Sequence, residues 1–195
     1  MALTKETFSL GINDLKLYPI TADTASAYTI GTGVDVPGVQ SITFEITIDE
    51  KELKGDETIQ DIWSKAQSVK VDFSSAKMSL DVLKSLLGGT ITSSGTTPSQ
   101  SQTWSYDLGV INAYVQVAAK IDYVDTLANL EDLHIHFMKC KLSSTSGGSG
   151  TEEYATNEFS CKGINTQYAF TAPKGKAITV SMNETAASLS GIAST

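Results

Sequence analysis

The chain has 195 residues, of which 41% are hydrophobic and 18% are charged, and its formal net charge at pH 7 is −8. This composition predicts one folded domain spanning residues 1–195 and excludes general disorder. The basic residues are few and spread singly, which excludes sequence-independent binding to nucleic-acid phosphates, and no run approaches the roughly 18 apolar residues of a membrane span.

The first strong element is a strand over residues 39–48. Before it, residues 1–30 are a polar N-terminal arm with one short strand at 15–20, and Gly31, Gly33 and the Pro37-Gly38 pair mark turns. From residue 39 the sequence alternates, which predicts a half-buried strand with one wet face. The apolar side is Ile42, Phe44, Ile46 and Ile48, and the polar side is Ser41, Thr43, Glu45 and Thr47.

A charged segment, residues 49–67, follows and is interpreted as a loop, because it is too polar for a core. A second strand is expected at 69–73. A helix is then predicted after Ser79 as N-cap, with Met78 and Leu83 as a hydrophobic staple and Gly88-Gly89 as the stop. Its expected apolar stripe is Leu80, Leu83 and Leu87, widened by Val82 and Leu86.

The second half of the chain alternates strands with loops rich in Ser, Thr and Gly. A loop is expected at 92–102 and a flexible one at 143–157, whose first eight residues read SSTSGGSG. Strands are predicted at 103–108, 113–124, 133–142, 158–164 and 177–182, before a C-terminal tail at 185–195. In the second of these strands Val115, Val117, Ala119 and Ile121 share one face. The total is seven or eight strands and one helix, a mainly β protein.

One strand carries side chains that could bind a metal. Alternation would place His134, His136, Met138 and Cys140 on one face, and these are ligands that suit a soft metal. A straight strand spreads them over about 20 Å, so only the two histidines could share an ion. No metal site is therefore predicted. Cys140 and Cys161 are interpreted as reduced thiols, because the N-terminus lacks a secretory signal.

No arrangement of catalytic residues is apparent. Gly31-Thr32-Gly33 precedes a strand instead of opening a helix, so it is a turn and not a phosphate loop. The two histidines lie in one strand, and no nucleophile elbow occurs. Trp63 and Trp104 suit core or interface anchors better than sugar platforms. The sequence thus predicts neither an enzyme nor a cofactor.

Three segments in order resemble a known family: GTGVDVPGVQSITFEI, EKELKGDETI and SVKVDFSSAKMSLDVLKSLLGG. They are similar to the tail tube proteins of long-tailed (siphovirus-type) bacteriophages and prophages. The match covers residues 31–92, with weaker similarity at Glu158-Phe159-Ser160-Cys161 and Asn183-Glu184-Thr185.

The resemblance implies a fold of two packed β-sheets, a sandwich or barrel, flanked by one short helix. It also implies homohexameric rings whose inner sheets join into a barrel, stacked into a tube through which the genome is ejected. The expected partners are other copies of the chain, the tape measure protein, the tail terminator and the distal tail or baseplate proteins. The DNA crosses the lumen without specific binding. The expected location is the virion tail, which is assembled in the host cytoplasm. No membrane is expected as a partner.

Two surfaces follow as hypotheses. The polar side of the 39–48 strand, Ser41, Thr43, Glu45 and Thr47, is expected to face the lumen, where acidic charge, if concentrated there, would repel DNA. The 49–67 segment is expected to reach the adjacent ring, with Ile59 and Ile62 as further apolar anchors. The candidates for ring stacking are Lys51, Glu52, Lys54, Asp56, Glu57 and Trp63.

Three other functions remain open. The chain could be the tube subunit of a contractile tail or of a phage-like injection system, because the same physics serves each tube. It could also be a surface- or carbohydrate-binding β-sandwich module, although that reading expects clustered exposed aromatic residues. An enzyme is the weakest alternative.

Overall fold

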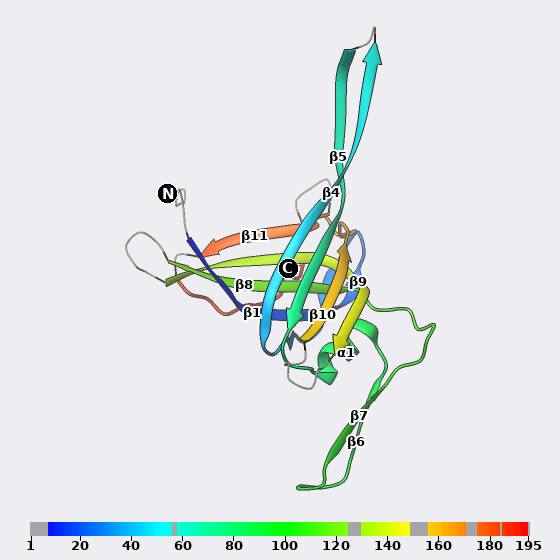
Figure 1. The fold of residues 1–195 in the computed structure, drawn as a ribbon, viewed down its shortest axis with the longest axis vertical. Coiled ribbons are helices and arrows are strands. Elements are labelled where there is room, and N and C mark those ends of the chain that lie inside the picture. Colours follow the sequence, from blue (N-terminus) through cyan, green and yellow to red (C-terminus); the bar gives the residue numbers. More distant parts are fainter. Residues whose placement is uncertain are drawn as a thin grey trace.

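The protein is mainly β with one short helix, as the sequence predicts. The computed structural model describes residues 8–55, 58–124, 130–148, 156–170, 175–183 and 185–194. The elements in these residues are β1 (Phe8–Asp23), β2 (Tyr28–Ile30), β3 (Val34–Asp35), β4 (Val39–Gly55), β5 (Thr58–Ser75), α1 (Leu80–Leu87), β6 (Thr90–Ser94), β7 (Ser101–Ser105), β8 (Val115–Val124), β9 (Leu130–Gly148), β10 (Thr156–Gly163) and β11 (Ile178–Asn183) (Figure 1).

One large antiparallel sheet folds back on itself at β9. Its strand order is β2-β1-β8-β9-β10-β5-β4, with β3 beside β1 and β11 beside β9. The first half of β9 pairs with β8 as far as Cys140, and the second half pairs with β10 from Cys140 onward. The first layer therefore contains β1, β2, β3, β8, β11 and the first half of β9, and the second layer contains the second half of β9, β10, β5 and β4. The two packed layers implied by the resemblance are halves of one sheet.

The hydrophobic core lies between these layers. Leu15, Leu17 and Phe137 are buried from the first layer, and Val71 and Phe73 are buried from the second. Strand β8 was expected almost as observed, at 113–124, but β1 was expected only in part: the N-terminal arm was assigned one short strand, and β1 extends over 16 residues. Residues 1–7 of that arm lie outside the described residues.

A β-bulge in β9 separates the side chains that the sequence places on one face. Val115 is opposite Cys140 and Val117 is opposite Phe137, so β9 has one more residue than β8 in this interval. An extra residue reverses the direction of every side chain beyond it. Cys140 consequently joins the core, whereas His136 and Met138 lie on the other side of the layer. The prediction that Cys140 shares a face with the histidines is wrong.

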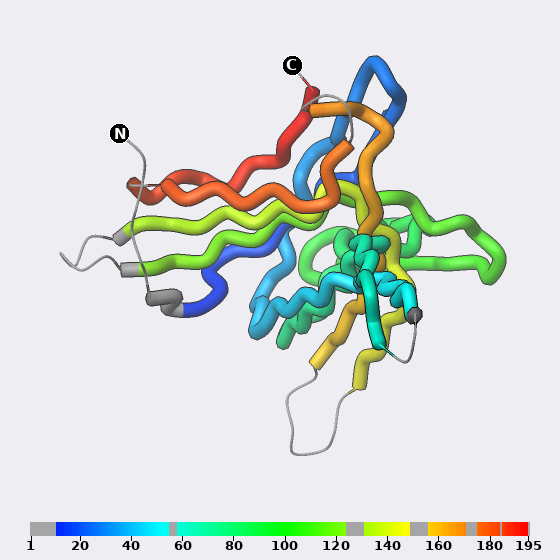
Figure 2. Tube along the Cα trace, turned by 90° about the horizontal axis from the view of Figure 1, so that it is seen from above, coloured from blue at the N-terminus to red at the C-terminus, as the bar shows by residue number. Residues whose placement is uncertain are grey.

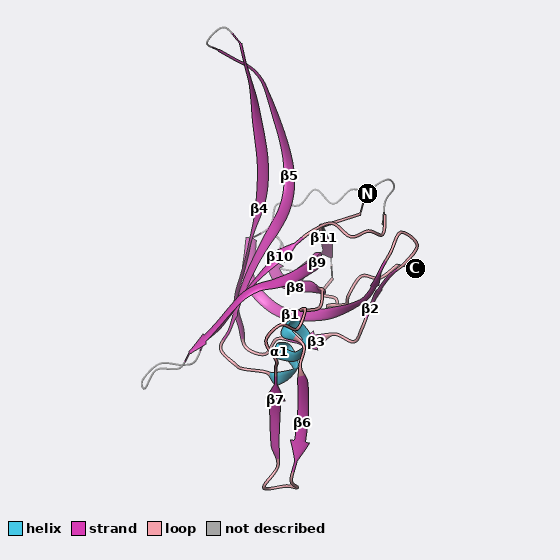
Figure 3. Ribbon diagram, turned by 90° about the vertical axis from the view of Figure 1, so that its right-hand side faces the viewer, coloured by secondary structure: helices cyan, strands magenta, loops and turns pink. Residues whose placement is uncertain are grey.

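The charged segment 49–67, expected to be a loop, continues two strands into a long hairpin. β4 and β5 remain paired well beyond the core, with Lys51 opposite Trp63 and Gly55 opposite Thr58. Cross-strand pairs of long side chains stabilise an exposed ladder of this kind. The hairpin projects from one end of the molecule (Figure 3). Residues 56 and 57 at its turn lie outside the described residues.

The single helix α1 ends as predicted and begins differently. Gly88 has a positive φ of 83°, and its N–H donates to the Lys84 carbonyl at 2.8 Å. Ser79 is extended at the N-cap but makes no side-chain capping bond, and Met78, expected to staple the first turn, is exposed. The deepest residues are Val82 and Leu86, which were expected only to widen the stripe, whereas the expected stripe of Leu80, Leu83 and Leu87 is partly buried.

Two segments expected to be loops lie partly in strands. Residues 92–94 belong to β6 and residues 101–102 to β7, whereas residues 95–100 connect the two strands as a loop. The β6–β7 hairpin projects opposite to the β4–β5 hairpin (Figure 1), and β7 ends at Ser105, before the end of the expected 103–108 strand. Of the expected 143–157 loop, residues 143–148 lie in β9 and residues 156–157 begin β10. Residues 149–155 lie outside the described residues.

The C-terminal segment 185–194 covers the outer side of the first layer (Figure 2). We call it the strap. Leu189 is buried against Tyr18 and Ala118. The buried Gln116 side chain accepts from the Ile192 N–H at 2.8 Å and donates to the Ile192 carbonyl at 2.9 Å. The first layer is thus covered on both sides, by the core and by the strap.

Candidate functional site

The second layer presents a polar surface on its side away from the core. Strand pairing aligns its outward side chains in rows across four strands, because alternate residues of each strand share a face. In the order β4, β5, β10, β9 the rows are Ser41-Ser74-Glu158-Ser146, Thr43-Asp72-Ser160-Ser144 and Glu45-Lys70-Lys162-Lys141. We call these three rows the polar face.

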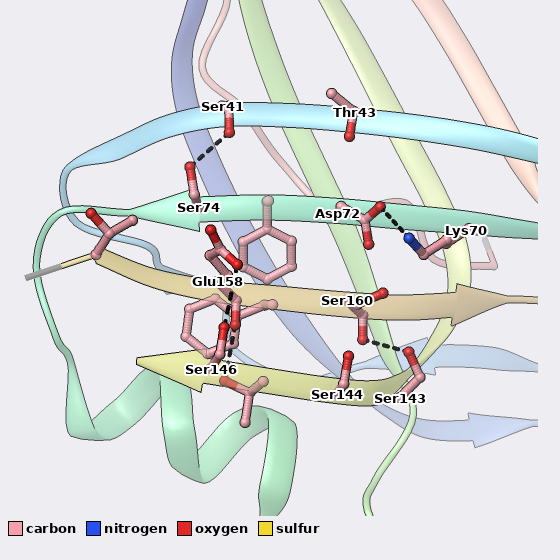
Figure 4. A pocket seen from close by; sticks show the side chains of 14 residues that line it. Ser41, Thr43, Lys70, Asp72, Ser74, Ser143, Ser144, Ser146, Glu158 and Ser160 are labelled. Atoms are coloured by element: carbon pink, nitrogen blue, oxygen red, sulfur yellow. Dashed lines mark hydrogen bonds and ion pairs between the residues drawn. The ribbon is translucent and has the colours of Figure 1, made fainter. Parts of the chain in front are cut away.

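Part of the polar face is hollowed and dominated by hydroxyl groups (Figure 4). The hollow has a volume of about 670 Å³ and is lined mainly by Ser and Thr side chains. Several hydroxyls are bonded within the sheet: Ser41 Oγ lies 2.7 Å from Ser74 Oγ, and Ser143 Oγ donates to the Ser160 carbonyl at 2.9 Å. Beneath them the Phe73 and Phe159 rings stack with centroids 5.0 Å apart. The surface is polar, and the layer below it is apolar.

The charges on the polar face cancel. Its acidic residues are Glu45, Asp72 and Glu158, and its basic residues are Lys70, Lys141 and Lys162, which gives a net charge of zero. The chain's charge of −8 is therefore not concentrated in these rows. The hypothesis of an acidic wall finds no support on this surface.

Lys70 and Asp72 form the tightest ion pair of the polar face, with Lys70 Nζ 2.8 Å from the Asp72 carboxylate. Burial alone would raise the pKa of Asp72, but hydrogen bonds from Lys70 and Ser160, together with the Lys70 charge, hold that pKa below its usual range. The hydrogen bond to Asp72 and the Asp72 charge raise the pKa of Lys70 in turn. Both groups are ionised at neutral pH.

The four lumen-facing candidates lie together on the exposed side of β4. Ser41, Thr43 and Glu45 each begin one of the three rows, and Thr47 lies one step further, opposite Ser68. Sequence reasoning missed the rest of the rows. The signal was present in β10, where Glu158, Ser160 and Lys162 alternate with the buried Phe159 and Cys161, but strand order cannot be read from such alternation.

The β4–β5 hairpin carries the candidates for ring stacking. Lys51, Glu52, Lys54 and Trp63 are all exposed on it, whereas Asp56 and Glu57 lie outside the described residues. Lys54 Nζ is 3.3 Å from a Glu52 carboxylate oxygen, and Lys51 Nζ lies 6.0 Å from the centroid of the Trp63 ring. The hairpin therefore carries exposed charges of both signs, and solvent weakens the interactions between them.

Exposed apolar side chains continue the core side of β4 into this hairpin, where Ile62 pairs with Glu52 and Ile59 pairs with Lys54 on the same side. Phe44 is 50% exposed, although its ring still contacts Phe137 at a centroid distance of 5.6 Å. We call the exposed residues on this side the outer strip: Phe44, Ile46, Ile48, Ile59 and Ile62. Ile42, nearest the start of the strand, packs against the core as the alternation predicts, and Phe44 reaches the core through its contact with Phe137. The strip is interrupted on the same side by the pair of Glu50 and Ser64, which lies between Ile48 and Ile62.

Both edges of the second layer are open among the described residues. β4 pairs with β5 on one side and with no described strand on the other, and residues 141–148 of β9 pair with β10 alone. Unpaired strand edges template pairing with another chain. The polar face is therefore bounded by two surfaces that can accept a strand.

One of the two histidines, His136, binds the strap. The His136 ring is buried, and its Nε2 lies 2.8 Å from the Ser190 carbonyl oxygen, so that nitrogen donates a proton to the strap. Burial lowers the pKa of His136. Asp132 also holds the strap by accepting from the Ala187 N–H. Within the described residues no three His, Cys, Asp or Glu side chains are grouped to hold a metal ion.

The two cysteines are buried free thiols in the core. Burial raises the pKa of Cys161 to about 12 and also raises the pKa of Cys140. The thiols are therefore protonated at neutral pH and are shielded from reagents. In the part of the chain that is described, no helix has the length and hydrophobicity required to cross a bilayer.

No protein-family model and no curated protein sequence matches the chain significantly.

Proposed function

We propose that this chain is the structural subunit of a phage tail tube, in which rings of six copies stack around a channel that carries the genome. The observation that carries the proposal is the second layer, which combines an outward polar face with open strands at both edges. A domain complete in itself has no use for this combination, because open edges promote association.

The strand order supports closure into a ring. In the order β9, β10, β5 and β4, every neighbouring pair is antiparallel. Placing β4 of one copy beside β9 of the next continues this alternation, since four strands is an even number. Such a contact joins different surfaces of identical subunits, and it gives a closed ring when the rotation closes. Six copies, the number implied by the resemblance, would place their polar faces on one continuous barrel.

The polar face suits the lining of a channel through which DNA slides. Hydroxyl groups keep the wall hydrated, and strong phosphate binding requires unbalanced Lys or Arg. Here three lysines are balanced by three carboxylates, and Lys70 is bonded to Asp72. The wall would therefore neither bind nor strongly repel its cargo. In this proposal DNA passes because the polar face is electrically neutral, and not because acidic residues repel it.

The β4–β5 hairpin projects along the long axis of the molecule (Figure 1) and is in position to reach the next ring. Lys51, Glu52, Lys54 and Trp63 are the described stacking candidates. The proposed partners are other copies of the chain in the tube, with the tape measure, terminator and distal tail proteins, in the virion tail. A tube subunit of a contractile tail or injection system is the alternative within the same class.

The proposal is tested by size-exclusion chromatography and negative-stain electron microscopy of the purified protein over a range of concentrations. We expect rings or tubes with a central lumen, increasing with concentration. A Ser144→Pro, Ser146→Pro variant, altered at the open edge of β9, should lose assemblies. A protein that remains monomeric at high concentration, in low and high salt, would count against the proposal.

A further inference from the structure

The charges of the polar face balance in sum but are unevenly placed. The row that begins at Ser41 and the row that begins at Thr43 each carry one carboxylate and no lysine. The row that begins at Glu45 carries one carboxylate and three lysines, and therefore a formal charge of +2. One row of the second layer thus has an excess of positive charge.

That excess lies toward the β9 end of the row. Lys162 on β10 pairs directly with Lys141 on β9, and like charges directly opposite each other destabilise a sheet. Among the described residues neither of these two lysines forms an ion pair. Lys141 Nζ lies 5.2 Å from the centroid of the Tyr114 ring, a contact that supplies no negative charge. A carboxylate beside Lys141 would relieve this repulsion.

The two open edges of the second layer carry opposite charges on their polar sides. In the three rows, Glu45 is the charged residue of β4 and Lys141 is the charged residue of β9, and both belong to the same row. We propose that Glu45 of one copy forms an ion pair with Lys141 of the next copy, an inference that rests on the proposed ring. The occupant of each edge is a second copy because each edge supplies the charge that the other lacks.

Strand pairing permits this contact. In a continuous sheet the polar side of β4 can face only the polar side of β9, because alternate residues share a face. When the rows of successive copies are aligned, Glu45 lies directly opposite Lys141. A stagger of two residues makes them diagonal neighbours, which long side chains still bridge. Each Glu45 then lies between Lys70 of its own copy and Lys141 of the next.

The pair can form only between copies. Within one chain β5 and β10 separate β4 from this part of β9 (Figure 1). Three strand spacings, about 14 Å, therefore lie between the backbones of Glu45 and Lys141 in the monomer. The two charges should consequently be coupled in assemblies and independent in the isolated subunit.

Charge reversal tests the pair. Glu45→Lys and Lys141→Glu should each raise the protein concentration at which rings form, by about tenfold or more, because every contact around the ring then opposes like charges. The combined variant Glu45→Lys, Lys141→Glu restores the attraction with its signs exchanged, so it should form rings near the wild-type concentration. Sedimentation velocity over a dilution series measures all three variants.

The matched control combines Glu45→Lys with Lys162→Glu. It has the same net charge as the combined variant, but its new carboxylate lies on β10, between β5 and β9, and it should restore little. Urea denaturation of dilute monomer gives the second readout. There the effects of Glu45→Lys and Lys141→Glu on the free energy of unfolding should simply add, because the two sites do not touch.

Three results would overturn the pair and leave the proposed tube intact: rings that the single reversals do not weaken, a combined variant that does not restore them, or equal restoration by Lys162→Glu. Coupling of the two sites in the monomer would also overturn it, by placing the contact within one chain. If the wild-type chain forms no rings under any condition, this inference fails together with the proposed function.

Discussion

The two layers of the sheet differ in how completely the chain covers them. The first layer packs on the core on one side and is covered by the strap on the other, through Leu189 and the paired bonds of Gln116 to Ile192. The second layer packs on the core on one side only. Its other side is the polar face, and both its edges are open among the described residues.

This difference indicates where other molecules would contact the protein. The strap covers the outer side of the first layer. No described segment covers the second layer in the same way. The second layer has instead a regular pattern of polar side chains and a hairpin on which the apolar residues of the outer strip are exposed among the described residues. The first layer is therefore covered on both sides within the monomer, and in the proposed tube the second layer is the one that assembles.

The largest expected effect contrasts two phenylalanines whose rings touch. Phe137, in the first layer, is 1% exposed, whereas Phe44, in the second, is half-exposed. Phe137→Ala should lower the free energy of unfolding of the monomer by about 3–5 kcal/mol, because it leaves a cavity in the core. Phe44→Ala should lower it by about 1 kcal/mol. Urea denaturation of dilute, monomeric protein measures both.

Assembly should reverse the order of these effects. Phe44→Ala removes apolar area from the outer strip, so it should impair tube formation although the monomer is folded. Electron microscopy at matched concentrations reports this directly. Equal losses of monomer stability, or normal tubes from Phe44→Ala, would remove the distinction between the layers.

Much of the second layer could be predicted because alternation survives in its sequence. The polar side of β4 reads directly from Ser41 to Thr47, and the same period gives the core side of β5. The hairpin was missed for a physical reason. Its residues are charged and exposed, as in a loop, but pairs such as Lys51 opposite Trp63 continue the ladder, and such pairing involves residues distant in sequence.

The first layer was harder to predict. The bulge that turns Cys140 into the core adds one residue to β9 relative to β8, so it is defined only once the two strands are paired. The strap has no periodic pattern, because it is held through its backbone. The strap's backbone N–H and C=O groups bond to the side chains of Gln116, Asp132 and His136. Backbone groups are common to all sequences, so they leave no pattern from which the strap could be predicted. Its position therefore depends on buried side chains elsewhere in the chain.

A smaller effect is expected from acid on the first layer. Because burial lowers the pKa of His136, the unfolded chain binds a proton at this site near its ordinary value of 6.5, and the folded chain does so only at lower pH. Stability should therefore fall as the pH drops below about 6.5, by at most about 1.4 kcal/mol per pH unit. His136→Gln retains a donor toward Ser190 and should weaken this dependence. Urea denaturation at pH 5.5 and 7.5 measures it, and an identical loss in both proteins would contradict the assignment.

The smallest effect concerns the ion pair on the polar face. Lys70 donates to Asp72 and holds its pKa below the usual range, so Lys70→Gln should raise that pKa toward its ordinary value. Because Lys70 is exposed, solvent screens the pair and the unfolding free energy should hardly change. Carboxyl carbon NMR titration of the monomer measures the shift. Lys162→Gln, which removes the same charge from β10 at a position opposite Lys70, is the matched control and should leave Asp72 nearly unchanged. If both variants shift Asp72 equally, the pKa reflects the summed charge of the polar face. In that case the summed charge of the polar face, more than any single bond, would govern the ionisation of its carboxylates.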